Sequence, residues 1–281
     1  MKNIKIVFAI VLLILLVLYI RNIYDIICYN KSTNGESYQY QNIEDIRKIL
    51  KSKKDKIIVI DPGHGGVDPG KVGNNNELEK NINLSIAFKL RDYLVSHGFS
   101  VIMTRNSDIG LYGDTDRNKK NSDLRNRVNL INESDAIAVV SIHQNSFASE
   151  KERGAQVFYH EKSIISKNMA KDVQEALKEY HDKDNKRVEK ANTSYYILKK
   201  TIKPTIIIEC GFLSNYDEAK NLITDTYQDS VAKAIGNGMV VWANKILESI
   251  YWFFYAIRVY LSTQIKVQVI IWKEDNNGYD C

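Results

Sequence analysis

Apolar residues along the middle of the chain follow two alternating periods. Short β-branched runs predict buried strands, and apolar residues three or four positions apart predict amphipathic helices between them. Strands are expected at Lys56–Ile60, 99–104, 136–142, 154–159, 195–198 and 205–210. Helices are expected at Glu79–Ser96, 122–132, 164–180, 217–222 and 231–247. This alternation predicts an α/β fold, a three-layer αβα domain with a mostly parallel twisted sheet covered on both faces.

The N-terminal region contains a membrane-directed pattern. An apolar run from Ile6 to Ile20 follows two lysines, and with its apolar flanks it approaches the roughly 20 residues of a spanning helix. A secretory signal peptide has a run of similar length, but no small-residue cleavage site follows here. We expect an uncleaved transmembrane signal-anchor over residues 1–28, a linker over 29–55, and the remainder outside the cytoplasm because the lysines favour the cytoplasmic side.

The C-terminal region differs in composition from the predicted α/β domain, which spans residues 56–248. The extension over 249–281 holds two of the three tryptophans and two apolar patches. Neither patch is long enough to span a bilayer. An interfacial amphipathic helix and an extension peculiar to this chain both fit the pattern.

Charge and cysteine content narrow the chemistry. The 281 residues carry 39 lysines and arginines against 34 acidic residues, a net charge of +5 without a basic block, so no nucleic-acid partner is expected. The three cysteines are widely spaced, which disfavours a disulfide framework or a cysteine zinc cluster. Any metal must therefore be held by carboxylates and by some of the five histidines.

Three predicted strands lead to residues whose side chains can bind a metal ion or transfer a proton: His64, His143 and Glu209. A histidine after a strand is more often a structural hydrogen-bonding residue, but a buried lone carboxylate is costly unless it is paired or near a cation. Two histidines and a carboxylate form an open zinc site with a fourth position for water. Glu77 and Glu79 are both candidates for the third ligand, and Glu209 would stand beyond the ligands as general base.

Four motifs in order resemble the zinc-dependent N-acetylmuramoyl-L-alanine amidases. They are Asp61–Gly66, Glu79-Lys80 at the start of a helix, Ser141–Asn145 and Ile208–Leu213. The resemblance covers roughly residues 56 to 247. It implies that one zinc ion per chain is bound by His64, Glu79 and His143, that Glu209 is the catalytic acid/base, and that peptidoglycan is the substrate.

Within that family, the short domain, the Met103–Arg105 strand end and the predicted anchor are most similar to the germination-specific spore-cortex amidases. This resemblance implies removal of the stem peptide as a step toward muramic-δ-lactam. The alternatives are another zinc hydrolase of muropeptides, either a carboxypeptidase or a deacetylase, and a non-catalytic wall-binding regulator.

Substrate contacts are less well specified by the sequence. Asn145 and Arg125 are candidates for orienting muropeptide carbonyls or carboxylates, and the competing interpretations are a loop cap and a solvated helix face. No wall-binding repeat is present in the sequence. This motivates the hypothesis of an extracytoplasmic lipoprotein partner in addition to the membrane anchor.

Overall fold

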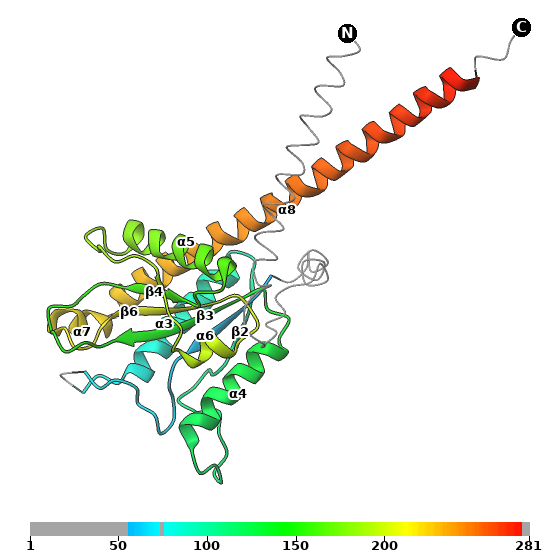
Figure 1. Ribbon diagram of the computed structural model, residues 1–281. Coiled ribbons are helices and arrows are strands. Elements are labelled where there is room, and N and C mark those ends of the chain that lie inside the picture. Colours follow the sequence, from blue (N-terminus) through cyan, green and yellow to red (C-terminus); the bar gives the residue numbers. More distant parts are fainter. Residues whose placement is uncertain (1–55, 74–75, 277–281) are drawn as a thin grey trace, which may run out of the picture. The chain divides into compact units, whose positions relative to one another are not determined.

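A six-stranded sheet forms the centre of the α/β part of the chain (Figure 1). The computed structural model describes residues 56–73 and 76–276. The strand order is β2-β1-β3-β6-β4-β5, and four of the five pairings are parallel, since only β4 and β6 run antiparallel. The strands are β1 (Ile57–Pro62), β2 (Ser100–Met103), β3 (Ala138–Asn145), β4 (Gln156–Tyr159), β5 (Lys190–Ala191) and β6 (Thr205–Phe212).

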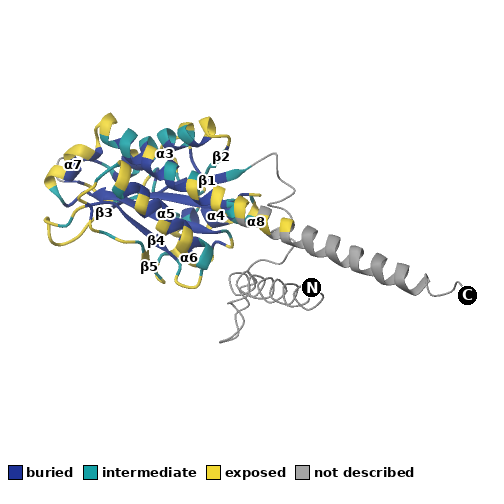
Figure 2. Cartoon of the chain, turned by 90° about the horizontal axis from the view of Figure 1, so that it is seen from above, coloured by how far each residue is buried: buried dark blue, intermediate teal, exposed yellow. Residues whose placement is uncertain are grey.

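Helices flank both faces of this sheet, and its central strands are almost wholly buried (Figure 2). On one side, α3 contacts β1, β2 and β3, and its Tyr93 hydroxyl donates to Asn237 of α8 at 2.6 Å. On the other, Val128 of α4 packs with Phe158 and Ile207. The helices are α3 (Glu79–Ser96), α4 (Lys119–Glu133), α5 (Ile164–Tyr180), α6 (Tyr196–Lys200), α7 (Tyr216–Leu222) and α8 (Asp225–Asn276).

The strand predicted at 195–198 is wrong, because residues Tyr196–Lys200 form the helix α6. Ile197 and Leu198 are consecutive and both buried in one apolar cluster. In a strand, consecutive side chains would point to opposite faces, whereas the helical turn lets both join the same cluster.

The helix predicted at 122–132 begins earlier in the structure, because α4 starts at Lys119. Ser122 and Asp123 lie within the helix, and the cap is Asn118, whose side chain accepts a hydrogen bond from the Asn121 amide. Asp123 instead accepts from Arg127 Nε at 2.7 Å. The helix begins with a polar turn that the apolar pattern does not mark.

The two ends of the chain are described to different extents. The helix predicted at 231–247 begins earlier and continues to Asn276, so residues 249–276 of the predicted extension are helical. The predicted anchor (1–28) and linker (29–55) lie outside the described residues. Within the described part of the chain, no helix combines the length and apolar character needed to cross a membrane.

Candidate active site

The turn after β1 places His64 at the carboxyl ends of the parallel strands. His64 has a φ of 62°, a left-handed conformation that is uncommon outside glycine. The preceding Gly63 is required by close packing, because a Cβ there would lie 2.2 Å from the ring of His143. The two imidazole centroids are consequently only 5.0 Å apart.

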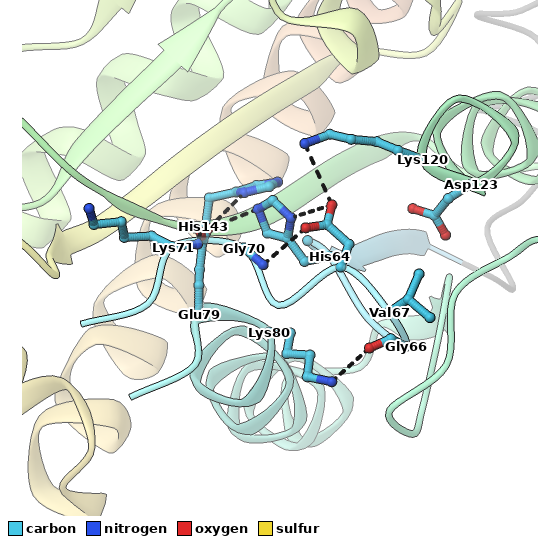
Figure 3. Close-up of polar contacts among 12 residues, drawn as sticks. His64, Gly66, Val67, Gly70, Lys71, Glu79, Lys80, Lys120, Asp123 and His143 are labelled. Atoms are coloured by element: carbon cyan, nitrogen blue, oxygen red, sulfur yellow. Dashed lines mark hydrogen bonds and ion pairs between the residues drawn. The ribbon is translucent and has the colours of Figure 1, made fainter. Parts of the chain in front are cut away.

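The first residue of α3 completes a cluster with these histidines. Oε1 of Glu79 lies 3.0 Å from His143 Nδ1 and 3.3 Å from His64 Nε2 (Figure 3). One candidate ligand atom from each of the three residues falls within 4.8 Å of the other two. Of the two candidate glutamates, Glu79 rather than Glu77 lies in this cluster.

The donor set suits zinc in type and spacing. Neighbouring ligands of a tetrahedral zinc ion lie about 3.4 Å apart, since each bond is about 2.1 Å, close to the separations seen here. His64 Nδ1 lies 3.0 Å from Asp68 Oδ2, the outer-shell contact that commonly orients metal-binding histidines. Oε2 of Glu79 accepts from the Lys71 amide at 2.7 Å, so the carboxylate is held from both sides.

Electrostatics keep this carboxylate ionised. Burial alone would raise the pKa of Glu79, but the hydrogen bonds and charges of His143 and His64 outweigh it and hold that pKa far below its usual range. Burial likewise opposes the charged form of His64, yet Glu79 and Asp68 raise the pKa of its imidazole. The cluster is thus an anionic oxygen between two imidazoles, an arrangement that attracts a cation.

Glu209 lies beside the cluster on β6, in register with His143 on the neighbouring strand β3. It is buried, and the Tyr195 hydroxyl donates to its Oε1 at 3.2 Å. Its Oε2 is also buried and has no hydrogen-bond partner among the described residues. Burial raises the pKa of Glu209, although His143 and Tyr195 act in the opposite direction.

Sequence comparison places this site in a known protein family. The N-acetylmuramoyl-L-alanine amidase family matches residues 58–240. The chain belongs to this family. The amidase is 40% identical over 206 residues to the germination-specific N-acetylmuramoyl-L-alanine amidase of Bacillus subtilis, covering 72% of this chain and 86% of that relative.

A solved structure and a more distant relative are also amidases of this kind. The CwlD amidase from Clostridioides difficile, solved in complex with the GerS lipoprotein, is 43% identical with a TM-score of 0.66, covering 68% of this chain and 99% of that one. The amidase AmiA of Escherichia coli is 27% identical over 253 residues, covering 75% of this chain and 81% of that relative. The amidase is therefore a peptidoglycan hydrolase with a germination-specific homologue.

The two predicted substrate contacts occupy different places in the amidase. Asn145 ends β3, and its Oδ1 accepts from the Ser146 amide at 2.8 Å. Arg125 is exposed on α4 and donates to Ser122 Oγ at 3.2 Å. Both contacts fit the competing interpretations, a loop cap and a solvated helix face, and the substrate roles stay predictions.

Three residues of the site were missed by the sequence analysis: Arg105, Arg127 and Tyr195. Arg127 donates to the backbone oxygen of His64 at 2.6 Å, and Arg105 donates to that of Gly63 at 3.0 Å. A signal for Arg127 does exist, because it lies on the same helical face as the apolar Leu124, Val128 and Ile131. Tyr195 left no such signal.

Proposed function

We propose that His64, Glu79 and His143 hold one zinc ion and that Glu209 is the catalytic acid/base of a spore-cortex amidase. The bond hydrolysed joins the lactyl carbonyl of N-acetylmuramic acid to the amine of L-alanine. The observation that carries the proposal is the meeting of two imidazoles and one carboxylate beside a second, buried carboxylate with a free oxygen.

When bound, zinc polarises the carbonyl and lowers the pKa of a coordinated water toward about 7. The chain supplies the proton transfers. Glu209 Oε2 accepts a proton from the attacking water and delivers it to the L-alanine nitrogen as the carbon–nitrogen bond breaks. General acid–base catalysis of this kind contributes about 10²- to 10⁴-fold, and a raised carboxyl pKa favours it. Tyr195 holds Oε1, which leaves Oε2 for the proton transfers.

Two relatives support the proposed cellular setting. The germination-specific amidase of Bacillus subtilis supports a role in germination, and we assign that role to the spore cortex, as a step toward muramic-δ-lactam. The lipoprotein bound to the CwlD amidase of Clostridioides difficile supports a lipoprotein partner here. We assign residues 1–28 to an anchor, 29–55 to a linker, 56–248 to the extracytoplasmic catalytic domain and 249–281 to an extension.

Two variants test the proposal. Purified E209Q and wild-type amidase are incubated with cortex peptidoglycan, and the products are identified by mass spectrometry. Wild type should release free stem peptides and leave the glycan intact, while E209Q should lose at least about 100-fold in rate and keep its zinc. H64A should lose zinc by elemental analysis.

Other outcomes identify the competing functions. Release of a terminal D-amino acid would indicate a carboxypeptidase, and release of acetate a deacetylase. Peptidoglycan binding without any bond cleavage would indicate a wall-binding regulator. Near wild-type cleavage by E209Q would remove Glu209 from the reaction, and full zinc occupancy in H64A would exclude that ligand set.

A further inference from the structure

Arg105 is a buried cation without a carboxylate partner. It is 2% exposed, and none of the ion pairs found among the described residues includes it. All four of its hydrogen-bond acceptors are backbone carbonyl oxygens. This contrasts with Arg127, whose guanidinium is paired with both Asp61 and Asp123 at 2.7 Å.

The four carbonyls belong to the two segments that carry candidate metal ligands and to the loop that follows β2. Arg105 Nε donates to Pro62 at 2.9 Å, and Nη2 donates to Gly63 at 3.0 Å, immediately before His64. The same Nη2 donates to Lys80 at 2.7 Å, immediately after Glu79. Nη1 donates to Ser107 at 3.0 Å.

The charges of Asp61, Asp108 and Asp123 favour the ionised form of Arg105 but do not offset its burial. Burying a guanidinium is costly when no carboxylate pairs with it, and a cation near the first turn of a helix opposes the helix dipole. Burial, followed by the charge of Arg127, lowers the pKa of Arg105 to about 10. The side chain nevertheless stays charged at neutral pH and holds two separate segments at a fixed spacing.

We propose that Arg105 is a positioning residue that sets the spacing between His64 and Glu79 and thereby the affinity of the site for its metal ion. The inference rests on the proposed function, because it takes these two residues as zinc ligands. A Cβ at Gly65 would lie 2.2 Å from the backbone oxygen of Ile109 and 3.0 Å from Arg105 Cδ, so the guanidinium side chain passes close to the turn that carries His64. Lysine at position 105 would keep the charge but could not bridge the carbonyls with a planar fork.

The test compares R105K with R187K in the full-length amidase. Arg187 is a matched control, because it also donates to a backbone carbonyl, that of Arg153 at 2.7 Å, but has no bond to the His64 turn or α3. Zinc affinity is measured by competition with a chromogenic chelator. R105K should bind zinc about 10- to 100-fold more weakly, the usual effect of losing an outer-shell contact, and R187K should match wild type.

Thermal unfolding separates positioning from plain stability. A merely structural role would lower the unfolding temperatures of the zinc-free and zinc-loaded protein equally and leave zinc affinity unchanged. That result would overturn the inference. Positioning predicts a smaller zinc-induced rise in R105K than in wild type. If R105K cannot be purified, R105Q, which keeps donors without the charge, is measured in the same way.

H64A separates this inference from the proposed function. If wild type binds no zinc, or if H64A binds it undiminished, the proposed metal site itself fails. If H64A loses zinc while R105K and R105Q bind it as wild type does, only the role of Arg105 fails.

Discussion

The hydroxyl of Tyr195 lies 3.2 Å from Oε1 of Glu209. The tyrosine ring is held edge-on against Phe158, with centroids 5.6 Å apart, and its amide donates to Asn192 Oδ1 at 2.9 Å. One carboxylate oxygen is thereby fixed by a rigid donor, while the other keeps no partner in the described part of the chain. A general base benefits from such asymmetry, because its reactive oxygen is oriented before substrate arrives.

We expect Y195F to lower kcat about tenfold with little change in KM or zinc content. A hydrogen bond to a charged group contributes about 1.5 kcal/mol or more, and about 1.4 kcal/mol corresponds to tenfold in rate. Steady-state kinetics on purified muropeptides measures the effect. In an E209Q background the same substitution should change nothing further, and additive losses would show that Tyr195 acts elsewhere.

Gly70 allows the cluster to close, and G70A should disrupt it. Gly70 has a φ of +69°, and a Cβ there would lie 2.6 Å from Glu79 Oε2 and 2.7 Å from His64 Cδ2. We expect G70A to lose zinc affinity and activity by at least about tenfold. G98A is the matched control, since Gly98 has a φ of +81° with nothing within 4 Å. It should cost about 1 kcal/mol of stability and keep zinc, whereas equal zinc loss in both variants would mean that backbone strain alone is responsible.

Asp61 should make stability depend on acid pH. Burial would raise its pKa, but Arg127, with hydrogen bonds from Thr104 and Ser141, lowers it from 3.8 to about 2. The stabilisation is therefore complete above the unfolded value and is lost as pH falls from about 4 to 2, about 2 kcal/mol in all. Urea unfolding of wild type and D61N should differ most at neutral pH and converge toward pH 2.5. The control is D92N at an exposed site, whose free energy of unfolding should not converge on that of wild type in this way. A difference between D61N and wild type that stays constant with pH would show that Asp61 is not the source of the acid dependence.

Metal removal should destabilise the amidase as well as inactivate it. A ligand at 100 times its Kd stabilises a protein by about 2.7 kcal/mol, which corresponds to about 5–10 °C for a domain of this size. Differential scanning fluorimetry after chelation and after zinc readdition measures the shift. In H143A the zinc-dependent shift should disappear, and an unchanged shift there would place the metal outside the cluster.

Helices with several turns of apolar spacing were predictable from the sequence. Short elements, and features set by contacts between distant segments, were not. The helices at Glu79–Ser96 and Ile164–Tyr180 were predicted at their observed bounds, since each has several turns of apolar spacing. The segment at 195–198 is too short for a period to distinguish strand from helix. The antiparallel direction of β4 has no local sequence signal, because it depends on pairing with β6, a strand distant in the sequence.

The candidate site was also predictable only in part. Histidines and carboxylates at strand ends were visible because strand ends meet at one edge of a sheet. The orientation of each group was not visible, because Arg105 and Tyr195 reach the site from segments that contribute no ligand. Their hydrogen bonds join residues 14 and 42 positions apart, and no spacing rule connects such pairs.

The strand order has a consequence for the growing chain. Among the strands that the structure describes, β6 is the last to be synthesised, yet it lies between β3 and β4, so the sheet remains in two halves until β6 inserts. His64, Glu79 and His143 all precede β6, whereas Glu209 arrives with it. An incomplete polypeptide that ends before β6 therefore contains the three proposed zinc ligands but lacks Glu209.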